Sequence, residues 1–245
     1  MKISLLILFL IISLSLKAQY KSAIDVIIGT DYSSQYVRNT NQDSFYIRIF
    51  DKEKRWNAGK IGYRFGINYN RQVTPHFYIK TGLRFVNMGY ESRVNITDLR
   101  WISELNPVMG VFEPDPTLPH RIDKYIYNYF FLEIPINGRC EFTSTKWRPS
   151  LEAGIAPHIY LTTSSTTVLD IEQQTGWQRS KSNRTLSWVA NAAFGINYSL
   201  HNRHQGFLQS NASYHLNPIG KKATEEPIKG NFYSFGLETG FRFQL

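Results

Sequence analysis

A histidine and a carboxylate are the residues of this chain whose types and spacing come closest to catalytic chemistry. Glu133 and His158 lie in two successive apolar–polar segments that are joined by a short turn near Thr145. If the two segments form a hairpin, residues whose numbers sum to about 291 face each other across it. That register pairs Glu133 with His158, and Arg139 with Glu152, all on the polar face. An imidazole beside a carboxylate is the arrangement of a general base and the group that orients it.

Other features of the sequence argue against an enzyme. The chain has no Gly-x-Ser-x-Gly motif, phosphate-binding loop or run of metal ligands, and no serine in the setting of a nucleophile accompanies His158. Four further histidines fall on predicted loops and strand ends: His120, His201, His204 and His215. We therefore expect no enzymatic activity, no cofactor and no metal. The alternative is a lipid A-modifying enzyme that uses His158 with Glu133.

Further charged residues share the polar face of the predicted strands. Together with the pair above they form a predicted lumen charge network: Arg64, Lys80, Arg84, Glu133, Arg139, Glu141, Glu152, His158, Glu238 and Arg242. Acids and bases are both present, so the cations have partners within reach. A barrel of eight strands is only wide enough for side chains to fill it. The sequence thus predicts a lumen plugged by ion pairs; conduction or gating through the lumen is the alternative.

The elements that must position these side chains are long β-strands. In residues 231–245 the side chains alternate strictly, with Tyr233, Phe235, Leu237, Phe241 and Phe243 on one face and small or polar residues on the other. This period of two predicts a strand, and about ten residues suffice to cross a bilayer at a tilt. The same pattern recurs in seven earlier segments, of which the last is the least regular: about 24–31, 59–70, 76–88, 126–142, 151–161, 188–198 and 206–216.

The connections between these strands alternate between short and long. The short ones are 71–75, 143–146 and 201–205, and the long ones are 33–58, 91–124, 163–185 and 217–230. This layout predicts an all-β protein, an eight-stranded antiparallel transmembrane β-barrel with short periplasmic turns and long extracellular loops. Pro135 and Pro157 should lie at nearly the same height on adjacent strands, and we expect a local distortion of the wall there.

A soluble secreted β-sandwich or lipocalin-like barrel is the competing fold, because alternation alone does not say which face points inward. Two observations favour the membrane. Glycines concentrate on the polar face, as a cramped lumen requires. Aromatic residues of the apolar face gather near the strand ends, as in the two interfacial girdles of a membrane barrel, and Phe207 is assigned to one of them.

The beginning of the chain predicts export. Lys2 precedes an apolar run from Ile3 to Ile12, and Ala18 lies near its exit, which is typical of a secretory signal peptide. We predict a signal peptide at 1–19, a barrel domain at 20–245, and localisation in the cell outer membrane. The net charge of +9 among 245 residues is scattered, without a nucleic-acid-binding motif. Outer-membrane lipids and lipopolysaccharide are the expected partners, and nucleic acid is not.

One hairpin carries a more specific pattern. The segment Phe131–Pro135, with the sequence Phe-Leu-Glu-Ile-Pro, is followed after a turn by Leu151–Pro157, with the sequence Leu-Glu-Ala-Gly-Ile-Ala-Pro. This hairpin resembles the PorT-like outer-membrane β-barrel family of Bacteroidetes. The resemblance spans essentially the mature chain, although only this hairpin is distinctive, and it implies a barrel whose namesake takes part in the type IX protein secretion pathway.

The function that we expect is a structural or interaction role with surface-displayed loops. A protein partner would bind through the extracellular loops or the periplasmic turns, where Trp101, Phe112, Trp177 and the segment 114–116 supply adhesive groups. A small transporter or an accessory of protein secretion is the alternative.

Overall fold

The computed structural model describes residues 21–39, 57–93, 122–142, 145–169, 173–178, 183–201, 204–218 and 228–245. The predicted signal peptide, Trp101, Phe112 and the segment 114–116 lie outside these ranges. The described strands are β1 (Ser22–Asn39), β2 (Asn57–Thr74), β3 (Phe77–Arg93), β4 (Ile122–Glu133), β5 (Ile136–Glu141), β6 (Trp147–Leu169), β7 (Gln173–Gln178), β8 (Leu186–His201), β9 (His204–His215) and β10 (Ile228–Gln244). Within the described ranges, no helix has the length and apolar character needed to span a membrane.

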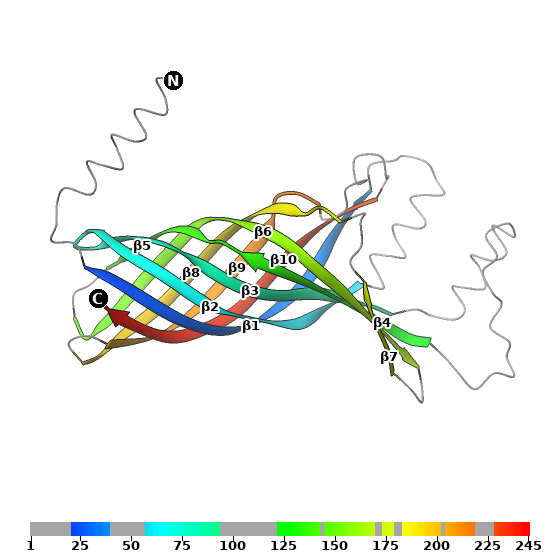
Figure 1. Ribbon diagram of the computed structural model, residues 1–245, viewed down its shortest axis with the longest axis horizontal. Coiled ribbons are helices and arrows are strands. Elements are labelled where there is room, and N and C mark those ends of the chain that lie inside the picture. Colours follow the sequence, from blue (N-terminus) through cyan, green and yellow to red (C-terminus); the bar gives the residue numbers. More distant parts are fainter. Residues whose placement is uncertain are drawn as a thin grey trace, which may run out of the picture.

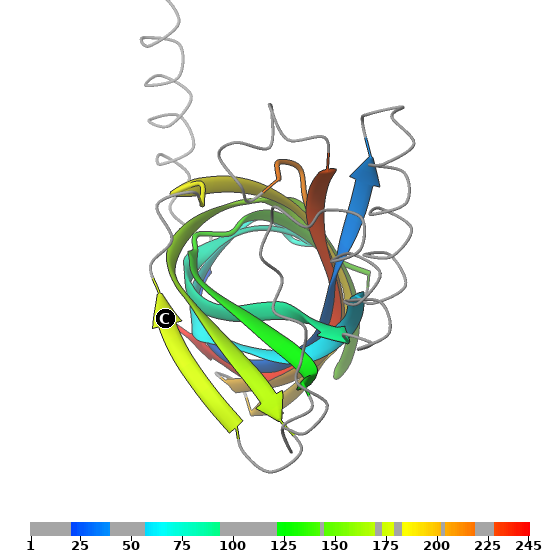
Figure 2. The same ribbon diagram turned by 90° about the vertical axis from the view of Figure 1, so that its right-hand side faces the viewer.

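These strands form one closed antiparallel barrel (Figures 1 and 2). β4 and β5 are the two halves of a single barrel strand, since both pair with β3 on one side and with β6 on the other. β7 is an appendage that pairs with the distal part of β6. The remaining neighbours follow chain order, and β1 pairs with β10 to close the ring. The predicted eight-stranded transmembrane barrel is confirmed.

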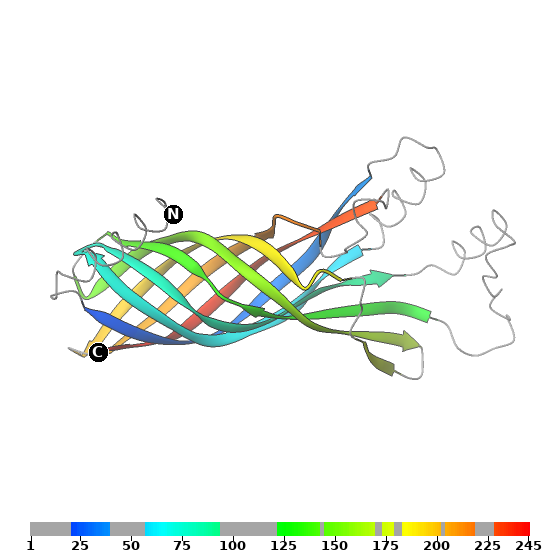
Figure 3. The same ribbon diagram turned by 45° about the horizontal axis from the view of Figure 1, so that its top comes forward.

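The two ends of the barrel differ. At one end β2 joins β3, β5 joins β6 and β8 joins β9 through a few residues each, and at the other end the connections are long. We call these the short-turn end and the long-loop end. β10 finishes at the short-turn end, where Leu245 donates a backbone hydrogen bond to Ser22. At the long-loop end β1 and β10 project on one side, and β4, β6 and β7 project on another (Figure 3).

The apolar faces of the strands point outward and the polar faces point inward, which rules out the soluble alternative. Phe235 and Phe241 are each 58% exposed on the outer surface, whereas Glu238 and Arg242 of the same strand are buried inside. Aliphatic and aromatic side chains cover the outer wall on the other strands as well. Because backbone groups are paired around the closed ring, this surface can face lipid tails without an open strand edge.

The predicted distortion at the prolines is a gap in the strand without a bulge. Regular strand structure stops at Glu133 and resumes at Ile136, because Pro135 has no N–H group to donate. The register is unchanged across the gap, since Glu133 faces His158 and Ile136 faces Ile155. The irregularity of register lies further along, where Phe130 faces Thr162 while Phe131 faces Tyr160.

Three predictions about the long-loop end and β9 were wrong. Strands extend into the predicted loops, so that β6 runs to Leu169 instead of ending near Leu161. Trp177, expected in a loop, lies in β7, and its ring stacks on Phe130 at 5.2 Å between centroids. β9 alternates as regularly as the other strands and turns Phe207 inward, so this ring is not part of an outer girdle. It packs under the guanidinium of Arg242 instead.

Candidate functional site: the filled lumen

The lumen near the short-turn end is organised around two carboxylates. Arg242 donates from Nε to Asp25 Oδ1 at 2.7 Å and from Nη2 to Asp25 Oδ2 at 2.9 Å. Its Nη1 also donates to Glu141 Oε1 at 3.3 Å. Glu141 receives a second, close hydrogen bond from Arg139, and Arg148 lies 3.7 Å away on its other oxygen. Asp25, which the predicted network did not include, is therefore the main partner of Arg242.

A second group lies in the middle of the lumen. Lys80 donates to Glu152 Oε2 at 2.9 Å. Arg84 bridges two strands that are not neighbours, since its Nη1 lies 3.2 Å from Glu133 Oε1 and 3.5 Å from Glu238 Oε2. All five of these side chains are buried. The predicted facing of Arg139 and Glu152 is confirmed in the register, but each of the two forms its ion pair elsewhere.

Arg64 forms a pair of its own. Its Nε donates to Asp31 Oδ2 at 2.6 Å, and both side chains are buried. Asp31, like Asp25, lies on the inward face of β1. The sequence pattern places both aspartates on the polar face of the first strand. Because the alternation of that strand is weak, neither aspartate was included in the predicted network.

The predicted facing of Glu133 and His158 is confirmed, and the pair belongs to a larger cluster. His158 Nε2 lies 2.7 Å from Glu133 Oε2. The ring of His215 meets the ring of His158 edge-on at 4.9 Å between centroids, and Ser187 Oγ lies 3.4 Å from His215 Nδ1. His215 lies at a strand end as predicted, since it ends β9, and its side chain is fully buried in the lumen. Ser187 is the cross-strand neighbour of His158, which sequence reasoning missed.

An apolar cluster covers the histidines on the side of the long loops. Its buried members are Val86, Met88, Phe131, Tyr160 and Phe232. Tyr90 and Tyr129 pack against this aromatic cap, with ring centroids 5.9 Å and 5.1 Å from that of Phe232. On β3, β4 and β10 these apolar side chains occupy inward positions of the otherwise polar face. Their presence on that face is the feature of the sequence that could have predicted the cap.

The lumen of this barrel is thus stratified into ion pairs, a histidine cluster and an aromatic cap. Buried charges require partners, and the described charges of the predicted network all have one. No group of three or more potential metal ligands occurs in the described part of the chain. The arrangement can hold strands together and fill space. Ser187 and the two histidines lie buried beneath the cap.

Solved structures of three outer-membrane proteins are similar to this chain at low sequence identity. Among solved structures, Neisserial surface protein A is 10% identical, with a TM-score of 0.42 over 90% of this chain and 97% of that chain. OprG from Pseudomonas aeruginosa is 9% identical, with a TM-score of 0.44 over 92% and 95% of the two chains. Ail of Yersinia pestis is 8% identical, with a TM-score of 0.36 over 91% and 99%.

No curated protein matches the sequence significantly. A family model does match: it describes the outer membrane protein beta-barrel domain and covers residues 17–220. That match spans most of the chain and includes the strands from β1 to β9, while β10 lies beyond it. The chain therefore belongs to the outer membrane protein beta-barrel domain family, and it resides in the outer membrane.

Proposed function

We propose that this protein is a non-conducting outer-membrane barrel with a structural or interaction role. The filled lumen carries the proposal. Ions would have to pass both the Arg84 bridge between Glu133 and Glu238 and the aromatic cap around Phe232. An eight-stranded barrel holds its side chains with little room to spare, and breaking a buried charge pair is costly. The rigid wall then serves to hold the two ends of the barrel at opposite faces of the membrane.

Conductance in planar bilayers tests this proposal. The purified protein should give no discrete channel openings at concentrations at which a porin, as positive control, gives many. A variant with Phe131→Ala and Phe232→Ala opens the aromatic cap but keeps the ion pairs, so we expect it to stay closed as well. Reproducible single-channel steps from the wild type would refute the proposal and favour the transporter alternative.

The interaction role is supported by the shape of the long-loop end. β1 and β10 project beyond the barrel on one side, and β4, β6 and the β7 hairpin project on another (Figure 3). With short turns in the periplasm, as in other barrels of this class, these extensions rise toward the cell exterior. Trp177 of β7 is 67% exposed and offers an aromatic contact there. Outer-membrane lipids and lipopolysaccharide surround the wall, and a protein partner would bind at either end.

An accessory role in protein secretion is the second candidate, and the hairpin around Pro135 and Pro157 favours it. Its two sequence segments resemble those of PorT-like barrels of Bacteroidetes, and the gap that they create in β4–β5 is a specific feature of the wall. Deletion of the gene, followed by analysis of the secreted proteins, tests this role. A loss of secreted proteins that is restored by the wild-type gene supports it, and an unchanged secretome refutes it.

A further inference from the structure

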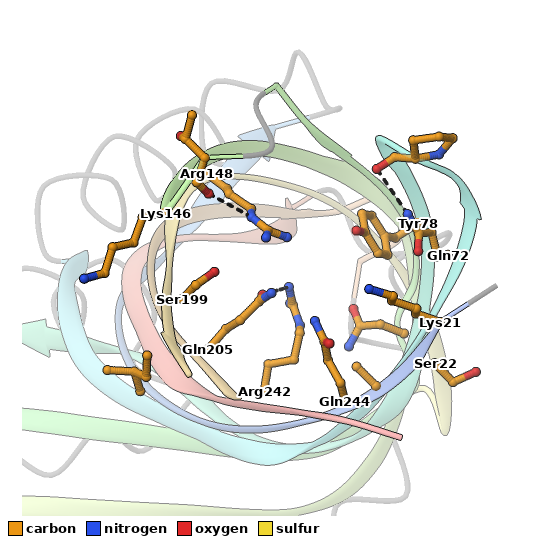
Figure 4. A pocket seen from close by; sticks show the side chains of 15 residues that line it. Lys21, Ser22, Gln72, Tyr78, Lys146, Arg148, Ser199, Gln205, Arg242 and Gln244 are labelled. Carbon is orange, nitrogen blue, oxygen red and sulfur yellow. Dashed lines mark hydrogen bonds between the residues drawn. The ribbon is translucent and has the colours of Figure 1, made fainter. Parts of the chain in front are cut away.

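The short-turn end contains a polar cavity of about 520 Å³, which we call the vestibule. Strand ends of β1, β2, β3, β6, β8, β9 and β10 surround it (Figure 4). Side-chain amides and hydroxyls supply much of its lining, among them Gln72, Tyr78, Gln205 and Gln244. Its volume lies within the range of small-molecule sites.

Positive charge dominates the vestibule. Lys21, Arg148 and Arg242 point into it, whereas Lys146 points away (Figure 4). The ammonium of Lys146 lies over the ring of Tyr198, 5.0 Å from its centroid, on the outward face of β8. Lys146 therefore lies at the same end of the barrel as the other cations, but its side chain points away from the cavity.

The carboxylates nearby do not balance this charge. Asp25 is engaged by both arms of Arg242, and Glu141 is shared by Arg139, Arg148 and Arg242. Counting Lys21 with these three arginines, four cationic side chains meet two carboxylate side chains among the described residues, an excess of two positive side-chain charges. A field of one sign inside a low-dielectric wall attracts small ions of the opposite sign.

One hydroxyl in the lining of the vestibule has no partner. Ser199 Oγ is buried and has no hydrogen bond within the described part of the chain, so it can donate to a bound anion. Arg148 is already held in position, since its Nε donates to the Thr145 carbonyl at 3.0 Å and leaves the rest of the guanidinium turned toward the cavity (Figure 4).

We propose that the vestibule binds a small oxyanion, a phosphate or carboxylate group, that enters from the short-turn side. Arg148 and Lys21 contact the anion, and Arg242 contributes its field while it remains bonded to Asp25. A planar guanidinium suits the two oxygens of such a group, and the hydrogen bonds formed are charge-assisted. This assignment goes beyond the structural role proposed above, and it does not depend on whether the lumen conducts.

Titration of the purified protein in zwitterionic detergent with inorganic pyrophosphate tests the proposal. Ionic strength is held constant with sodium chloride, and isothermal calorimetry reports the binding. We expect saturable binding at one site. Arg148→Gln should weaken it by about tenfold or more, because a charge-assisted contact is lost. Lys21→Gln should weaken the binding of pyrophosphate too. Because Lys21 is exposed, this variant can replace Arg148→Gln as the test if Arg148→Gln does not fold.

Lys146→Gln is the matched control, since it removes an equal charge from the same mouth. Its affinity should stay within about twofold of the wild type, because the Lys146 ammonium is exposed, points out of the cavity over Tyr198 and is screened by salt. Absence of saturable binding, or an equal loss in Lys146→Gln and Arg148→Gln, would overturn the proposal. Addition of phosphatidylglycerol to the micelles identifies the source of the oxyanion: competition assigns the site to a lipid headgroup, and no competition assigns it to a soluble anion.

Discussion

Asp25 of the first barrel strand and Arg242 of the last are direct cross-strand partners, and the guanidinium bonds both oxygens of the carboxylate. The two residues are 217 positions apart in the chain, yet they meet at the seam where the barrel closes. The side chains of Arg242 and Asp25 are 4% and 0% exposed, so solvent screens the pair little. Closure of the ring thus coincides with formation of a buried, bidentate ion pair.

Asp25→Asn should destabilise the barrel by about 3–5 kcal/mol, because it leaves the Arg242 cation buried with only the shared Glu141 as a charged partner. Urea unfolding in lipid vesicles, followed by the heat-dependent mobility shift on gels, measures the change. The double variant Asp25→Asn with Arg242→Gln removes both charges and should recover part of the loss. A single variant as stable as the wild type would show that the pair contributes little to closure.

The close approach of β10 to β1 gives a second prediction. A Cβ atom on Gly236 would overlap the carbonyl oxygen of Thr30 and the side chain of Asp31 on the neighbouring strand. Gly236→Ala should therefore cost about 1–3 kcal/mol, the usual cost of overpacking. Gly206→Ala is the control in β9, where the nearest atom, Leu200 Cδ1, would lie 3.8 Å away. Equal stability of the two variants in the same urea assay would contradict the close approach.

The sequence was most informative where a short turn fixes the register. The hairpin around Thr145 predicts the facing of Glu133 with His158 and of Arg139 with Glu152, and both are confirmed. A period of two and a short connection leave little freedom, because a slip by one residue would turn every side chain to the wrong face. The gap at Pro135 follows equally from a missing backbone donor.

Partners across the barrel could not be predicted in the same way. Arg84 meets Glu238, and Arg242 bonds Glu141, through contacts that depend on strand tilt and barrel diameter. Alternation also fails where an inward residue is apolar. For this reason Phe207 was predicted to face the lipid, although its ring lies inside the barrel.

The buried histidine cluster predicts a protein without activity on lipid A. Overexpression of the wild type should leave the lipid A mass spectrum of the host unchanged, because His158, His215 and Ser187 are buried beneath the aromatic cap. Mass spectrometry of extracted lipid A measures this directly. A new lipid A species that appears with the wild type and disappears with a folded His158→Ala variant would instead establish an enzyme.

The outward face of β10 predicts how the barrel sits in the bilayer. Leu237 is 57% exposed on the outer wall and pairs with Thr30 and Ser210 near the middle of the strands, while Leu245 ends the chain on the same face at the short-turn end. Leu237→Arg should destabilise the folded barrel by about 2–4 kcal/mol, because it places a charge near the bilayer midplane. Leu245→Arg, at the interface, should cost only about 0–1 kcal/mol. Both values come from urea unfolding in vesicles. If Leu245→Arg were the more damaging, the apolar belt would have to lie nearer the short turns than the strand pairing implies.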